Sequence, residues 1–146
     1  MTTTETVIRT PLLQRLQDDW ERRRRGREFP ARADFDVLDM KYAMGNLTIV
    51  EVAYDPLRFR FRLHGSRISQ RVGYDMTGKD IEALPPALAP LVRRHFEAVV
   101  EERRPIVEVR ERQIADEGVF DSEVLALPLS RDGRTIDMLM VGVCFP

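Results

Sequence analysis

His95 is the residue whose type and setting most directly suggest chemistry. It shares one arc of a helical pattern with the apolar residues Leu88, Leu91, Val92, Phe96 and Val99. An imidazole in such a setting could ligate a haem iron. It could equally be a buried histidine that is hydrogen-bonded to the backbone or to a carboxylate. We favour the second interpretation, because nothing else in the sequence indicates haem, and we keep His95 as the candidate cofactor ligand.

The other reactive residue types lack the settings that their chemistry needs. Cys144 lies at the end of an apolar stretch, which indicates a packing residue. His64 lies on the arginine side of its strand, so we expect it to face solvent, and two histidines without an acidic partner do not make a zinc site. Ser66, Ser69 and Ser122 lack a "G-x-S-x-G" setting, and "GYDMTGKD" is not a phosphate-binding loop. We therefore predict no catalytic residue, no metal site and no enzymatic activity.

Two groups of arginines raise the question of a polyanionic partner: residues 22–25, and the alternating row at 58, 60 and 62. The chain has 23 Lys and Arg against 24 Asp and Glu, a net charge of -1, so it lacks the positive field of a nucleic-acid-binding protein. For residues 22–25 we therefore expect a solvated helix end or an inter-subunit salt bridge. For the row we expect solvated arginines, with Glu51 as a salt-bridge partner, and we expect no nucleic-acid partner.

Helical spacing is clearest in two segments. A first helix is predicted to begin at Thr10-Pro11 and to carry the apolar strip Leu12, Leu13, Leu16 and Trp20. The long helix that carries His95 is predicted over residues 86–103. Between the two we expect a short helix capped by Asp36 and ended by Gly45-Asn46, and later some short helical turns before residue 86.

Five strands are predicted, at residues 47–54, within 56–68, and at 106–114, 122–129 and 134–145, with a turn at Asp132-Gly133. The second strand alternates, with Leu57, Phe59, Phe61 and Leu63 on one side and Arg58, Arg60, Arg62 and His64 on the other. This half-charged strand suits a sheet edge. The last strand is apolar on both faces, as expected of a central strand.

This order of elements is shared by two α+β folds, the PAS sensor fold and the conical fold of ketosteroid-isomerase-like enzymes. The stretches "PARADFDVLDM", "RFRLHGSRI" and "LPLSRDGRTIDMLM" resemble the short, stand-alone bacterial PAS proteins once catalogued as a domain of unknown function. The resemblance covers residues 27–143. It implies a five-stranded antiparallel sheet in the order 2-1-5-4-3, with helices on one face and the N-terminal helix packed on a second copy or on the outer sheet face.

The resemblance also implies where a ligand would bind, between the sheet and the helices. Candidate pocket residues are Phe59, Phe61, Phe96, Met138 and Met140. PAS domains that hold haem do so through a histidine on the equivalent helix, which would be His95 here. We divide the chain into a helical extension, residues 1–28, and a PAS domain, residues 29–146.

The function predicted from these observations is that of a non-enzymatic PAS sensor that acts through contacts with a signalling protein. We expect a homodimer, with Leu12, Leu13, Leu16 and Trp20 at its interface. The single cysteine and the absence of a signal peptide or of about 18 successive apolar residues predict a cytoplasmic protein that does not enter the membrane. The alternatives are a haem-binding sensor and a small enzyme in the conical fold. Strand order is the observation that separates the conical fold from the PAS fold.

Overall fold

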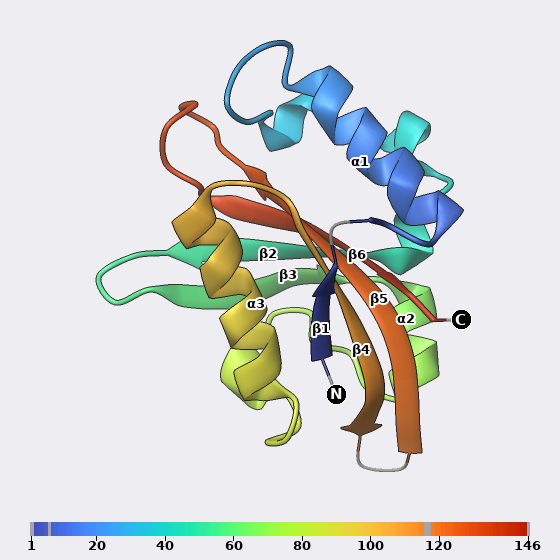
Figure 1. Ribbon diagram of the computed structural model, residues 1–146. Coiled ribbons are helices and arrows are strands. Elements are labelled where there is room, and N and C mark those ends of the chain that lie inside the picture. The colour runs from blue at the N-terminus through green and yellow to red at the C-terminus, as the bar shows by residue number, and fades with distance from the viewer. Residues whose placement is uncertain (1, 6, 116–117, 146) are drawn as a thin grey trace.

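One antiparallel sheet organises the molecule (Figure 1), and the computed structural model describes residues 2–5, 7–115 and 118–145. Within these residues a six-stranded sheet has the order β1-β4-β5-β6-β2-β3. Its strands are β1 Thr2–Glu5, β2 Leu47–Ala53, β3 Arg58–His64, β4 Ile106–Ala115, β5 Gly118–Leu129 and β6 Met138–Cys144. The five predicted strands are β2 to β6, and their order is the predicted 2-1-5-4-3. β1 is an addition that its polar sequence does not predict.

The connection between β5 and β6 is longer than the predicted turn. β6 begins at Met138 rather than at residue 134, and Asp132 organises the intervening loop by accepting hydrogen bonds from the backbone N–H groups of Arg134 and Thr135, each at 2.8 Å. These bonds, with that from Ser130, lower the pKa of Asp132 to about 2. Asp132-Gly133 therefore marks the reversal of the chain without forming a two-residue hairpin.

The helices lie on the two faces of the sheet. They are α1 Pro11–Arg23, α2 Ser66–Val72 and α3 Ala89–Glu102, together with the 3₁₀ helices η1 Arg32–Asp34, η2 Val37–Met40, η3 Met44–Asn46 and η4 Ile81–Ala83. α3 buries Val92, His95, Phe96 and Val99, as its apolar arc predicts. Asp36 caps η2 by accepting from the N–H of Leu38. None of the described helices has both the length and the apolar character needed to cross a membrane.

α1 packs on the outer face of the sheet, against β5 and β6. Leu13 and Leu16 are fully buried there. A Cβ added to Gly142 of β6 would lie 2.5 Å from Leu13 Cδ2 and 2.8 Å from Leu16 Cδ2, so this glycine lets the helix approach the strand. Trp20 is also buried, and Leu12 is half-buried. The residues predicted for a dimer interface therefore pack on the chain's own sheet.

A buried carboxylate holds the segment that leads into α1. Glu123 of β5 is 5% exposed, and its two oxygens accept from the backbone N–H groups of Arg9 at 2.7 Å and Thr10 at 2.8 Å. We expect Glu123→Gln to lower the free energy of unfolding by about 2 kcal/mol, because the new amide group would oppose a backbone donor. Urea denaturation measures the change. Glu51→Gln, on a side chain 46% exposed, is the matched control and should change stability by less than about 0.5 kcal/mol.

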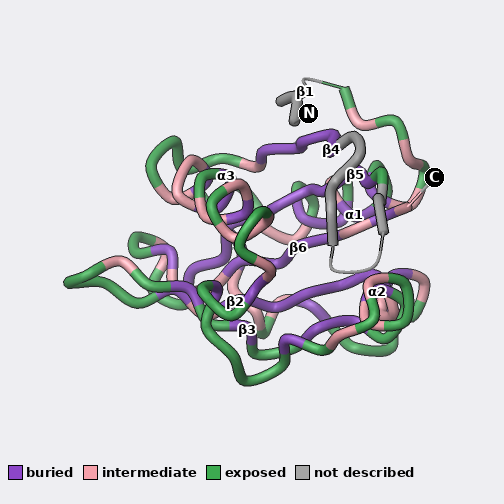
Figure 2. Tube along the Cα trace, turned by 90° about the horizontal axis from the view of Figure 1, so that it is seen from below, coloured by how far each residue is buried: buried purple, intermediate pink, exposed green. Residues whose placement is uncertain are grey.

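Buried residues follow the strands through the centre of the molecule, while exposed residues occupy the loops and the outer sides of the helices (Figure 2). β6 is buried along most of its length between β5 and β2, as predicted for the central strand. At the edge, the segment 78–79 lies beside β3: Gly78 N–H donates to Phe61 O at 2.7 Å, and Phe61 N–H donates to Lys79 O at 2.9 Å. The arginine-lined strand is thus partly protected on its open side.

Candidate functional site

A cavity of about 90 Å³ lies between the inner face of the sheet and the helices α2 and α3. Its floor is formed by strand residues and by one residue that follows β6: Thr48, Phe61, His64, Arg110, Ser122, Val124, Val141, Val143 and Phe145. Its cover is formed by Ile68, Val72, Tyr74, Leu84, Leu88, Val92 and Phe96. The walls are therefore largely apolar, with four polar side chains in the floor.

Strand register explains where the polar side chains lie. Thr48 of β2 pairs with His64 of β3, and Arg110 of β4 pairs with Ser122 of β5. Residues opposite each other in antiparallel strands project to the same face. The two polar pairs therefore flank the apolar centre of the floor, which β6 supplies through Val141 and Val143.

His64 lines the cavity and is 9% exposed, so the predicted solvent exposure is wrong. The cause is an irregularity in the pairing of β2 with β3. Ile49 pairs with Leu63 but the next residue, Val50, pairs with Phe61, which leaves Arg62 as an extra residue. Such a bulge reverses the side-chain alternation beyond it. Leu63 consequently turns outward, at 37% exposure, and His64 turns inward.

Hydrogen bonds fix the form of the His64 ring. The backbone N–H of Met76 donates to His64 Nδ1 at 3.3 Å, and Ser69 Oγ lies 3.0 Å from the same atom. Since Nδ1 accepts, the neutral ring carries its proton on Nε2. Burial lowers the pKa of His64, which favours this neutral form. The ring also stacks on Tyr74, another residue of the cavity wall.

His95 is fully buried but lies beside the cavity rather than in its wall. Its Nε2 lies 2.9 Å from the carbonyl oxygen of Ile106, and its Nδ1 lies 2.8 Å from Nη2 of Arg110. A carbonyl can only accept and a guanidinium can only donate, so Nε2 carries the proton and Nδ1 is the acceptor. Both nitrogens have partners, as in a histidine that serves structure, and the haem-ligand hypothesis gains no support from this arrangement.

Arg110 and Glu108, which the sequence analysis did not single out, bring buried charge to the same region. Arg110 is 6% exposed, and Glu108 is also buried. Glu108 Oε1 lies 3.8 Å from Arg110 Nε and 3.7 Å from His95 Nδ1, and neither Oε1 nor Nε makes a hydrogen bond among the described residues. Burial lowers the pKa of Arg110 to about 10, so it remains charged at neutral pH, and burial raises the pKa of Glu108.

The environment of His95 predicts a loss of stability in acid. Burial, and then the charge of Arg110, lower the pKa of His95 from its ordinary value of 6.5 to about 3. The unfolded chain therefore binds a proton below about pH 6.5 that the folded chain does not bind until about pH 3. We expect the free energy of unfolding to fall by about 2 kcal/mol between about pH 6.5 and about pH 5 from this group.

Urea denaturation at the two pH values, in the wild type and in His95→Gln, isolates this contribution. His64 acts in the same direction, whereas Glu108, whose folded pKa is raised, acts in the opposite one. The acid-induced loss of unfolding free energy in the wild type, minus that in His95→Gln, therefore measures the contribution of His95. Equal acid losses in both would contradict the assignment of the effect to His95.

The five predicted pocket residues separate into two groups. Phe61 and Phe96 line the cavity, and Phe59 packs behind them with its ring centroid 5.6 Å from that of Phe96. Met140, paired with Ile49, and Met138 share the side of β6 that carries Gly142 and therefore face outward. Met138 and Met140 therefore lie on the opposite side of the sheet from the three aromatic residues.

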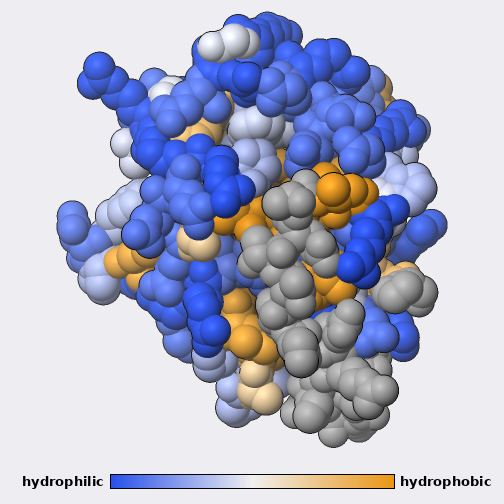
Figure 3. Space-filling model, viewed as in Figure 1, coloured by the Kyte–Doolittle hydropathy of each residue, from blue (hydrophilic) through white to orange (hydrophobic). Residues whose placement is uncertain are grey.

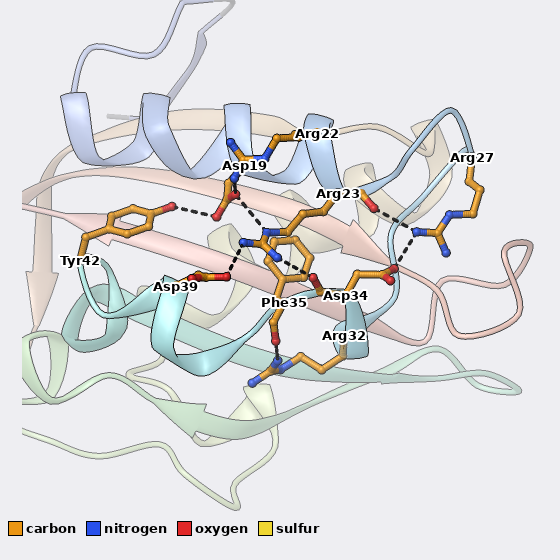
Figure 4. A network of polar contacts seen from close by, with 9 residues as sticks. All are labelled: Asp19, Arg22, Arg23, Arg27, Arg32, Asp34, Phe35, Asp39 and Tyr42. Carbon is orange, nitrogen blue, oxygen red and sulfur yellow. Dashed lines mark hydrogen bonds and ion pairs between the residues drawn. The ribbon is translucent and has the colours of Figure 1, made fainter.

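The arginines at the end of α1 bind to this chain's own acids (Figure 4). Arg22 and Arg23 both contact Asp19, and Arg23 also reaches Asp39 at 3.2 Å and the carbonyl oxygen of Asp34 at 2.8 Å. Arg24 pairs with Glu21. This network lies within one chain and ties α1 to the segment that contains η1 and η2.

The arginine row of β3 is exposed, as predicted, and Arg62 lies 3.9 Å from Glu51. Figure 3 shows hydrophilic residues over most of the visible face, with hydrophobic residues gathered near its centre. Cys144 is buried, and burial raises its pKa to about 11, consistent with a packing role. Among the described residues, no group of His, Cys, Asp or Glu side chains is arranged to hold a metal ion.

Strand order, the long helix over the inner face and the cavity beneath it together define an α+β fold of the PAS type. A protein-family model described as a PAS domain matches residues 8–143. The chain therefore belongs to the PAS domain family, whose members are in general sensory or regulatory modules. The match includes α1. A search of curated proteins found no match.

Proposed function

We propose that this PAS domain is a non-enzymatic sensor that binds a small ligand in the cavity and passes the signal to a partner protein by surface contacts. The observation that carries the proposal is the cavity itself, which has apolar walls, a few polar side chains and a cover formed by α2, α3 and the segment between them. Small-molecule sites commonly combine these features. The low cysteine content supports a cytoplasmic setting.

The alternatives have weaker support. A haem sensor would need a free nitrogen on His95, whose two ring nitrogens are both engaged. An enzyme in the conical fold would need a different sheet, since the strand order is that of a PAS domain. A homodimer stays a prediction, and one built on the apolar strip of α1 would require that helix to leave the sheet.

Thermal unfolding of protein purified from its own host, before and after denaturation and refolding in ligand-free buffer, tests the proposal. We expect loss of the ligand to lower the midpoint by about 5 °C. Val92→Phe, which fills the cavity, should show no such difference, whereas Val37→Phe, at a position 51% exposed, should behave as the wild type. Identical midpoints for the two wild-type samples would count against a bound ligand.

A further inference from the structure

Arg110 presents a buried positive charge to the cavity. Its side chain is 7% exposed and belongs to the cavity floor. Nη2 donates to His95, but Nε is buried and has no hydrogen-bond partner among the described residues. Leaving a buried charged donor without an acceptor is costly, so such atoms usually find one. The unpartnered Nε therefore points to a group that is not part of this chain.

Glu108 does not supply the missing acceptor. Its Oε1 lies 3.8 Å from Arg110 Nε, well beyond the roughly 2.7–2.9 Å of a charge-assisted hydrogen bond. That oxygen is itself buried without a hydrogen-bond partner. Burial also raises the pKa of Glu108. Glu108 thus offsets part of the charge of Arg110 without accepting a hydrogen bond from it. Arg110 Nε remains available as a donor.

His95 holds the guanidinium in place. Its ring is anchored by the carbonyl oxygen of Ile106, and its other nitrogen accepts from Arg110 Nη2. Arg110 is therefore oriented before a ligand arrives, and a ligand does not have to order a long side chain on binding. His95 thus has a positioning role, which agrees with the favoured interpretation of a buried, hydrogen-bonded histidine and not with the alternative of a cofactor ligand.

The remainder of the cavity restricts what the guanidinium can hold. Ser122 pairs with Arg110 across the two strands and adds a hydroxyl group at the same end of the floor. Between this end and the second polar pair, Thr48 and His64, the walls are apolar side chains such as Val124, Val143 and Phe96. The size of about 90 Å³ favours a short ligand body. The cavity thus combines one cationic corner with an apolar interior.

We propose that the ligand is a small molecule with an apolar body and one anionic group of the carboxylate type, which accepts hydrogen bonds from Arg110. The inference rests on the proposed function, because it specifies the chemistry of the ligand that the sensor would bind. It assigns Arg110 as the residue that selects an acid over a neutral molecule of the same shape.

Calorimetric titration of refolded, ligand-free protein with matched pairs of probes tests the inference. The probes are butanoate, hexanoate and octanoate, each compared with the alcohol of the same chain length. We expect the best carboxylate to bind at least about tenfold more tightly than its alcohol, because a hydrogen bond to a charged group has this strength. Arg110→Met should abolish the preference, and Arg110→Lys should retain part of it. Arg60→Met, on the exposed row of β3, is the control and should leave the preference unchanged.

The outcomes separate the inference from the proposed function. Equal affinity for acid and alcohol would overturn the anionic ligand while leaving a ligand-binding cavity in place. Binding of neither would count against both. A carboxylate preference that survives in Arg110→Met would assign the anion to another residue and overturn the role of Arg110. If circular dichroism shows that Arg110→Met does not fold, the wild-type comparison and Arg110→Lys decide the question.

Discussion

Replacing Trp20 by alanine is expected to lower the free energy of unfolding by about 4 kcal/mol. Trp20 lies near the end of α1, is 4% exposed and packs into the core cluster that spans the sheet. Its Nε1–H donates to the carbonyl oxygen of Pro128 at 2.8 Å. Truncation removes the ring from the core and leaves that buried carbonyl without its donor, so both losses act together. Urea denaturation followed by circular dichroism measures the effect.

The same experiment decides what α1 does. Because Trp20 packs within its own chain, the loss should not depend on protein concentration. Trp20→Phe keeps most of the ring and loses the hydrogen bond, so it should cost less than alanine, about 1–2 kcal/mol. If the stability of the wild type rises with protein concentration and that of Trp20→Ala does not, Trp20 serves a dimer interface and the packing of α1 on its own sheet is contradicted.

Gly65→Ala should lower the free energy of unfolding by about 3 kcal/mol. Gly65 joins β3 to α2, where the chain passes close to the segment before β2. A Cβ at this position would lie 2.4 Å from the carbonyl oxygen of Gly45 and 2.7 Å from that of Leu47. These are backbone atoms, which cannot rotate away as a side chain can. The added methyl group must therefore displace a strand end, and with it His64 in the cavity floor.

Gly26→Ala is the matched control for this substitution. Gly26 has φ +78°, and a Cβ there would meet nothing within 4 Å. Alanine should cost only about 1 kcal/mol at this position, from its left-handed backbone conformation. Thermal or urea denaturation of the two variants gives the comparison. Gly65 itself has φ −57°, a conformation that alanine adopts without strain, so its loss should come from the close contacts alone. A loss at Gly65 no larger than that at Gly26 would contradict the cost assigned to the close approach of the two chain segments.

Much of the fold follows from local patterns that the tertiary structure preserves. The apolar arc around His95 predicts the buried face of α3, and the arginine alternation predicts β3 as an edge strand. The apolar character of residues 138–145 predicts the central strand. In each case a local pattern, either periodic or uniformly apolar, covers most of the element, so the element itself can be predicted without knowledge of distant contacts. The order of the strands came from the family resemblance and not from these patterns.

The errors in the site have physical causes that periodicity does not reveal. The extra residue Arg62 reverses the alternation of β3, so His64 enters the cavity and Leu63 leaves it. A bulge depends on the partner strand and has no reliable signal in "RFRFRLHG" itself. Gly65 directly after His64 is the nearest indication that the strand ends against another segment.

A strand that is apolar on both sides does not show which side faces a cavity. The sequence therefore predicts Met138 and Met140 in the pocket wall, whereas the structure places the odd-numbered Val141 and Val143 there. Gly142 is the signal that could have settled the choice, since a glycine within an apolar strand indicates the close approach of another element, here α1.

Arg110 and Glu108 were missed for a related reason. Charged residues at alternate positions of a strand normally indicate a solvated face. Here that face of β4 lies beneath α3, where His95 provides a hydrogen-bond partner for Arg110. Only the packing of the helix on the strand reveals that the charges are buried.

The cavity beneath α3 is proposed to hold a small ligand in the cell. Native mass spectrometry of the protein purified from its own host tests it most directly, because one spectrum gives both ligand mass and subunit number. We predict one additional small mass per chain in the wild type and in Val37→Phe, and none in Val92→Phe. A wild-type protein that carries no additional mass, or one whose additional mass is fully retained in Val92→Phe, would contradict the claim.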